Sequence, residues 1–236
     1  MFNGKMKAVT FSYDDGVLQD KRLIEILDKY GLKCTFNINS SLLGTHNSLV
    51  REDVTVAHCK PRACEVKEIY KNHEVAVHTL THPYMKDLSD AEIICEVEYD
   101  RVRLSEIVGY NVVGMAYPGG THCIDERVAR VIRENTGVKY ARTTTSTYNF
   151  DLQEDLIMFN PTVYHHAEWD KMEELAKEFI ALKPDKPQIF YIWGHAYEFD
   201  IHNDWEKFEK FCALISGHDD IFYGTNTECL LANHGE

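Results

Sequence analysis

The chain has 236 residues, of which 44% are hydrophobic and 27% charged, the composition of a globular domain with a substantial core. Its formal net charge of −13 argues against nucleic acid, anionic membranes and polyanionic substrates as partners, and favours a neutral ligand. No apolar run approaches the roughly 20 residues that a membrane span needs, so no membrane association is expected.

Two features bear on the compartment. The residues before Lys7 lack the apolar stretch of a secretory signal peptide. The seven cysteines are scattered without a C-x-x-C pair, and several fall in apolar segments, as buried free thiols do. We therefore expect a cytoplasmic protein in a reducing environment, or a secreted one if an N-terminal segment has been removed.

Seven short apolar segments predict the strands of a sheet. Most are continuously apolar rather than alternating, which is typical of parallel strands that are covered on both faces. They are residues 8–13, 34–39, 74–79, 112–117, 138–142, 188–193 and 221–223.

Helical patterns fill several of the segments between these strands. Ser89 and Glu92 form a capping-box pattern before one of them. Repeated strand–helix alternation without a linker predicts a single α/β domain over residues 1–236, with a parallel sheet that is either a barrel or doubly wound. No glycine-rich nucleotide motif follows a strand, so nucleotide-binding folds lose support. Apolar residues recur at three-four spacing over residues 23–30, 94–108 and 172–182.

Polar and glycine-rich motifs follow four of the predicted strands. In parallel α/β folds, functional side chains gather at the carboxyl ends of strands. The carboxylates, the imidazoles and the tight turns of these motifs should therefore lie together at the edge of the sheet formed by the carboxyl ends of the strands, here called the rim. This convergence predicts a catalytic site at the rim. In chain order the motifs contain Asp14 and Asp15, then His78 and His82, then the turn Tyr117-Pro118-Gly119-Gly120, then Trp193 and His195.

The chemistry of these residue types points to metal-assisted hydrolysis. Two histidines and one carboxylate suit a borderline divalent metal such as zinc, which lowers the pKa of bound water to roughly 7. Asp14, beside the ligand Asp15, is free to take a proton from that water, and a later histidine can protonate the leaving group of an amide or ester. Alone, Asp-Asp-Gly and Tyr-Pro-Gly-Gly are more often turns and a single histidine is more often a core residue, while H-x-x-x-H is as often accidental as functional. Their joint occurrence at successive strand ends favours a site. We interpret His58, His73, His122, His165 and His166 as surface or structural residues.

The motifs resemble those of a known family. T-F-S-Y-D-D-G at residues 10–16 resembles the T-F-D-D-G motif of the polysaccharide deacetylases, carbohydrate esterase family four. H-T-L-T-H-P at residues 78–83 resembles the H-[ST]-x-x-H-P metal motif of that family, and W-G-H at residues 193–195 resembles its late L-x-H motif. The resemblance extends from Lys7 to about Gly224 and keeps the order and spacing of the motifs.

The resemblance implies a distorted (β/α)₇ barrel with mostly parallel strands. It also implies a metal-dependent deacetylase that removes N- or O-acetyl groups from a sugar or oligosaccharide through metal-bound water. Zinc is the expected ion, although cobalt, nickel or iron are accepted in the family. The implied roles are general base for Asp14, metal ligands for Asp15, His78 and His82, and general acid for His195.

Two departures from the family motifs affect these roles. The family motif R-x-P-[YF] reads A-Y-P-G at residues 116–119, so the arginine that pairs with the base is missing there. Arg142, at the end of the next predicted strand, is the expected substitute, and the backbone N–H of Gly119 can still bind an oxyanion. Tyr117, Pro118 and Trp193 complete the predicted substrate and oxyanion residues. The family's Asp-x-x-Asp-Trp motif has no match, so the residue that orients His195 is unassigned.

Three alternatives stay open. Relatives on the same scaffold open cyclic amides, and a family member that has lost turnover would only bind carbohydrate. An iron oxygenase also uses two histidines and one carboxylate, but it needs no general base such as Asp14 beside the ligand. The sequence leaves open the sugar, the acetyl linkage, the native metal and the oligomeric state.

Overall fold

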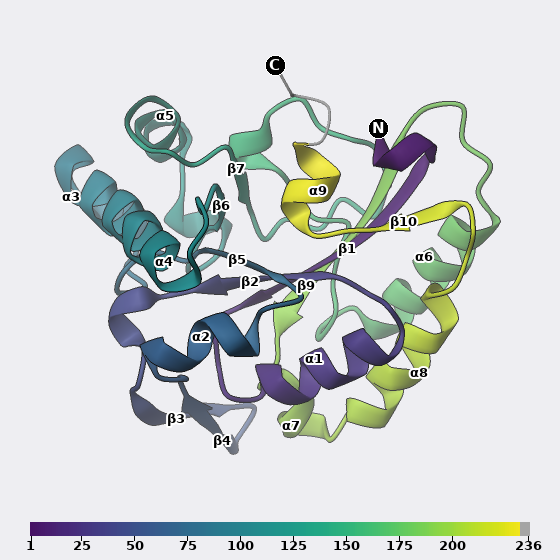
Figure 1. The fold of residues 1–236 in the computed structure, drawn as a ribbon, viewed down its shortest axis with the longest axis horizontal. Helices are drawn as coiled ribbons and strands as arrows, with labels where there is room; N and C mark the ends of the chain where they lie inside the picture. The colour runs from purple at the N-terminus through teal and green to yellow at the C-terminus, as the bar shows by residue number, and fades with distance from the viewer. Residues whose placement is uncertain (232–236) are drawn as a thin grey trace.

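The computed structural model describes residues 1–231, and most of their strands form one large sheet with helices around it (Figure 1). Strand β1 lies near the centre, and the order along the sheet is β7-β6-β5-β2-β1-β9-β8, with β10 also paired to β1. Every pairing between these strands is parallel. The strands are β1 (Lys7–Asp14), β2 (Cys34–Ile38), β5 (Glu74–Val77), β6 (Gly114–Ala116), β7 (Tyr140–Arg142), β8 (Val163–Tyr164), β9 (Gln188–His195) and β10 (Ile221–Tyr223).

Helices cover the outside of the sheet because a parallel strand must bury both of its faces. All eight residues of β1 are buried. Helices α3 to α5 lie toward one end of the sheet, and α6 and α8 toward the other (Figure 1). The helices are α1 (Asp20–Lys29), α2 (Ala63–Ile69), α3 (Asp90–Ile94), α4 (Asp100–Val108), α5 (Glu126–Asn135), α6 (Trp169–Ala181), α7 (Glu198–His202), α8 (Trp205–Ile215) and α9 (Asn226–Leu230).

The seven predicted strands are all present, and the curled parallel sheet is the predicted distorted (β/α)₇ barrel. The helix predicted over residues 94–108 is divided, because a π-helical turn over Cys95–Tyr99 separates α3 from α4. The capping box of Ser89 and Glu92 is present at the start of α3. No helix within residues 1–231 is long and apolar enough to cross a membrane.

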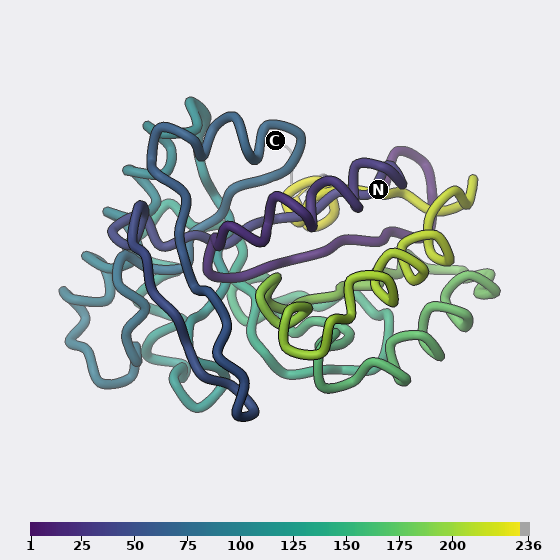
Figure 2. The backbone as a smooth tube through the Cα atoms, turned by 90° about the horizontal axis from the view of Figure 1, so that it is seen from below, coloured from purple at the N-terminus to yellow at the C-terminus, as the bar shows by residue number. Residues whose placement is uncertain are grey.

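A two-stranded antiparallel hairpin stands apart from the large sheet. Strands β3 (His46–Arg51) and β4 (Val54–Cys59) pair only with each other. Glu52 and Asp53 form the turn with φ of 51° and 60°, the left-handed values that a tight hairpin turn requires. In Figure 2 the hairpin projects from the body of the molecule as a dark blue loop.

Candidate active site

The register of the central strands brings the predicted residues together. Asp14, the last residue of β1, lies opposite His195 on β9 and opposite Asn37 on β2. The chain then turns sharply, with φ of 79° at Asp15 and 58° at Gly16. A Cβ on Gly16 would lie 2.9 Å from Ile38 Cγ1, so the turn requires glycine for both its φ and its space. The turn projects the carboxylate of Asp15 onto the rim beside that of Asp14.

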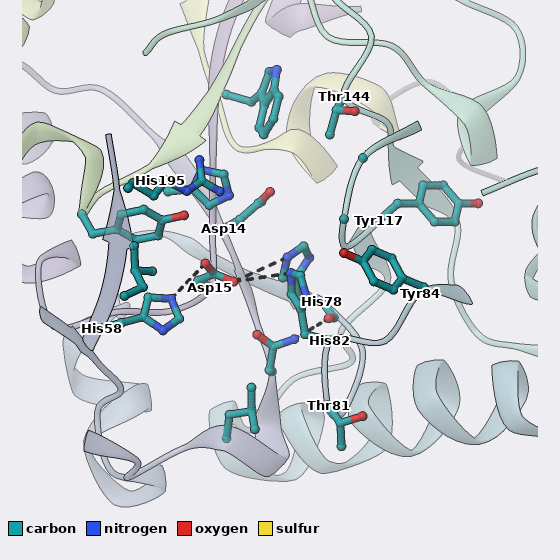
Figure 3. Close-up of a pocket in the computed structure, with 18 of the residues that line it drawn as sticks. Asp14, Asp15, His58, His78, Thr81, His82, Tyr84, Tyr117, Thr144 and His195 are labelled. Carbon is teal, nitrogen blue, oxygen red and sulfur yellow. Dashed lines mark hydrogen bonds and ion pairs between the residues drawn. The ribbon is translucent and has the colours of Figure 1, made fainter. Parts of the chain in front are cut away.

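Asp15, His78 and His82 form a cluster that suits a metal ion. Their ligand atoms all lie within 4.8 Å of one another, and the Nε2 atom of each histidine is 3.8 Å from Asp15 Oδ1 (Figure 3). His78 Nδ1 lies 2.8 Å from the carbonyl of Ala116, which can only accept a hydrogen bond. Nδ1 therefore carries the proton, and the lone pair of Nε2 faces Asp15, as in a metal-ligating histidine. Burial lowers the pKa of His78 to about 4, which keeps the imidazole neutral.

The carboxylate of Asp15 is held in its ionised form by two basic side chains. Burial by itself would raise its pKa, but Lys60 and a hydrogen bond from His58 outweigh burial and hold the pKa well below the usual value. His58 Nε2 lies 3.1 Å from Asp15 Oδ2, and Lys60 Nζ lies 4.0 Å from Oδ1. Figure 3 shows Asp15 between His58 on one side and His78 and His82 on the other. The interpretation of His58 as a surface or structural residue was therefore wrong, and Lys60 was not predicted to lie at the site.

Arg142 forms the expected ion pair with Asp14. Its Nη2 atom lies 2.5 Å from Asp14 Oδ2 and also contacts Oδ1. Asn37 Nδ2 donates a second hydrogen bond to Asp14 Oδ1 over 2.9 Å. Arg142 is fully buried and packs against the ring of Trp193 at 4.5 Å, so the predicted substrate residue Trp193 also supports the arginine. Asp14 is therefore charge-paired and held in one orientation.

His195 is oriented by Glu198, which sequence reasoning missed. Nδ1 of His195 donates to Glu198 Oε1 over 3.0 Å, and the backbone N–H of His195 donates to Glu198 Oε2 over 3.0 Å. Burial would lower the pKa of His195, but Glu198 outweighs it and raises that pKa. Burial would raise the pKa of Glu198, but His195 and the hydroxyl of Tyr164 lower it to about 2. The signal was a carboxylate three residues after the histidine, at the start of α7.

One cavity of about 920 Å³ is lined by Asp14, Asp15, His58, Lys60, His78, His82 and His195, whereas Asn37, Arg142 and Glu198 lie behind its wall. Tyr117, Gly119 and Trp193 of the predicted substrate set reach its wall, whereas Pro118 is buried in the same turn and does not. The hairpin closes one side of the cavity. His122, which was interpreted as a surface or structural residue, also lines the cavity. Further lining residues that were not predicted are Leu49, Arg51, Tyr84, Thr121, Thr144 and Tyr164.

The curled parallel sheet and the groups gathered at the carboxyl ends of its strands agree with the resemblance of the sequence motifs to the polysaccharide deacetylases. The chain belongs to this family, because the family model described as polysaccharide deacetylase matches residues 3–141. A comparison with curated proteins gives no match.

Solved structures of carbohydrate esterases share the fold. The chain is similar to a family 4 acetyl xylan esterase from Clostridium thermocellum in complex with a cobalt ion, at 15% identity and TM-score 0.58, over 97% of this chain and 93% of the other. It is similar to a family 4 carbohydrate esterase from Streptomyces lividans in complex with acetate, at 14% identity and TM-score 0.56, over 94% and 92%. A family 4 pseudoenzyme from Bacillus anthracis matches at 18% identity and TM-score 0.51, over 96% and 66%. At these identities the similarity establishes the fold alone. Catalytic activity has to be argued from the side chains of this chain.

Proposed function

We propose that this protein is a metal-dependent hydrolase that removes N- or O-acetyl groups from a neutral carbohydrate. Family membership supports the class of reaction and substrate. One observation carries the proposal for this chain: an oriented carboxylate, Asp14, and an oriented imidazole, His195, flank the cluster of Asp15, His78 and His82 in a single cavity.

Asp15, His78 and His82 would hold one divalent ion, with zinc favoured by the two imidazoles and one carboxylate, and with cobalt, nickel or iron as alternatives. Such an ion supplies Lewis acidity, which makes water a stronger acid at neutral pH and polarises the acetyl carbonyl. The neutral, oriented ring of His78 and the ionised carboxylate of Asp15 support this assignment.

The other residues act on protons and charge. Asp14 Oδ2 is the proposed acceptor of the proton lost by the attacking water, and Arg142 and Asn37 hold the carboxylate in place. His195 is the proposed donor of a proton to the leaving nitrogen or oxygen of the sugar, and Glu198 favours the protonated ring. The backbone N–H of Gly119, in the turn at the cavity wall, is the proposed donor to the oxyanion.

The test uses the metal-loaded protein and a panel of N-acetylated and O-acetylated neutral oligosaccharides, with acetate release as the measurement. We expect release from at least one class of sugar, loss of release after chelation, and recovery when zinc is returned. A cyclic-amide hydrolase would instead open cyclic amides and release no acetate. A carbohydrate-binding member without turnover would bind the sugars and release nothing, and either result would overturn the proposal.

A further inference from the structure

A second group of metal-ligand side chains lies outside the cavity. Glu52 is in the turn of the β3–β4 hairpin, His166 follows β8, and His202 ends α7. Glu52 Oε1 lies 2.9 Å from His166 Nε2, and Glu52 Oε2 lies 2.9 Å from His202 Nε2. We call these three residues the outer cluster. They are distinct from the residues that line the active-site cavity.

The geometry of the outer cluster is that of a small metal site. One ligand atom from each residue lies within 4.8 Å of the others, and each carboxylate oxygen faces a different imidazole. The two imidazole rings stack with centroids 5.2 Å apart and an angle of 21° between their planes. A divalent ion between the two imidazoles and the carboxylate would be coordinated by all three groups.

The outer cluster is partly exposed to solvent, which leaves one coordination position of such an ion open. The side chain of His166 is only 11% exposed, so one ligand is fixed in the body of the protein. The side chains of His202 and Glu52 are 48% and 52% exposed. Solvent can therefore supply the fourth position of a tetrahedral site.

We propose that the outer cluster is a second divalent-metal site, best suited to zinc, which fastens the tip of the hairpin to the body of the molecule. The three ligands come from three separate segments, so an ion bound to all of them links the hairpin to the β8–α6 segment and to α7.

The link matters because this hairpin forms part of the cavity wall. Leu49, Arg51 and His58 of the hairpin line the cavity. Arg51 Nη1 lies 3.4 Å from Glu198 Oε1, and its guanidinium lies 5.7 Å from the centre of the Tyr197 ring. A two-stranded hairpin is only marginally stable by itself, and β3 and β4 pair only with each other. An ion at its tip should therefore hold these cavity residues in place.

The test counts zinc bound to the full-length, metal-free chain by equilibrium dialysis and elemental analysis. We expect two equivalents in the wild type, one in His202→Ala and one in His82→Ala. His46→Ala, which removes an exposed histidine of the same hairpin outside the cluster, should keep two. Two equivalents in His202→Ala would overturn the proposal, and so would a wild-type chain whose single equivalent is lost in His82→Ala.

The same count separates this proposal from the proposed function. A wild-type chain whose single equivalent is lost in His202→Ala and kept in His82→Ala would support the outer site and contradict the inner one. Hydrogen exchange gives a second measurement in the His82→Ala background. Zinc at about ten times its dissociation constant should slow exchange of the amides of residues 46–59 by about tenfold, the factor that mass action gives for a site formed only in the folded hairpin. Glu52→Gln should abolish that slowing, and equal slowing with and without Glu52 would contradict the proposal.

Discussion

Both side chains of the ion pair between Arg142 and Asp14 are buried, so losing the pair should lower the free energy of unfolding substantially. Arg142→Met leaves the carboxylate of Asp14 buried without its partner, which should destabilise the protein by about 3–5 kcal/mol. Adding Asp14→Asn removes that unpaired charge, and the double variant should lose less than the sum of the single losses. Denaturant unfolding of the four proteins measures this coupling. Strictly additive losses would mean that the two side chains do not act on each other.

Glu198 should control the protonation of His195. Glu198→Gln keeps the shape of the side chain but removes the charge that raises the pKa of His195, so that pKa should fall. A general acid acts while it is protonated, so turnover declines as the pH rises through the pKa of His195. The decline should begin at lower pH in the variant than in the wild type. NMR titration of the His195 ring measures this pKa directly. The same pKa in Glu198→Gln and in the wild type would contradict the role of Glu198.

At the level of residues, the sequence predicted the functional side chains that lie at the carboxyl ends of strands. It did not predict the side chains that loops and the hairpin place beside them. Asp14, Asp15 and His195 each lie next to the end of an apolar run, where a functional side chain is expected. The role of Arg142 could also be predicted from the sequence, because a buried strand seldom ends on a cation that has no partner. His58 lies on a separate hairpin, and its contact with Asp15 depends on tertiary packing that no local pattern reveals.

Strand β9 carries a glycine whose small size positions its neighbours. A Cβ on Gly194 would lie 1.8 Å from His165 Nδ1, and the His165 ring itself packs against both Tyr13 and Phe199. Gly194→Ala should therefore displace the strand next to His195 and destabilise the protein by about 1–3 kcal/mol, as overpacking does.

The control for this substitution removes the clash from the other side. His165→Ala destabilises by leaving a cavity, but it also makes room for a Cβ at residue 194. Adding Gly194→Ala to His165→Ala should then cost little, and thermal or denaturant unfolding measures the difference. A cost as large as in the wild type would show that His165 is not the group that requires glycine.

At the level of elements, the buried strands of three or more residues were predictable, whereas the two-residue strand β8 and the exposed hairpin strands were not. Continuous apolar runs identify a strand that is covered on both faces. The hairpin strands are mostly exposed, and their turn, Glu52-Asp53, has no glycine to mark it. Helix α8 was not predicted, although its apolar residues recur at helical spacing. The sequence therefore contained enough information to predict this helix. The buried residues that carry the spacing are Phe208, Phe211, Cys212 and Ile215.

For the whole molecule, strand order and register determine the site. The sheet places β1 between β2 and β9, so residues far apart in the sequence meet at the end of β1. The sequence predicted that these groups would share one rim, because carboxyl ends of parallel strands do so. It could not predict the hairpin wall of the cavity or the outer cluster, since both depend on how irregular segments pack over the sheet.

The most direct test of the central claim is acetate release by the wild type and by Asp14→Asn, each loaded with metal at both proposed sites. The substitution keeps the shape of the side chain and removes the proton acceptor. We predict that the variant keeps its metal and still folds, although less stably because Arg142 loses its charged partner, while turnover falls by a factor of roughly 10² or more, the usual contribution of a general base. Near-normal turnover in metal-replete Asp14→Asn would contradict the account.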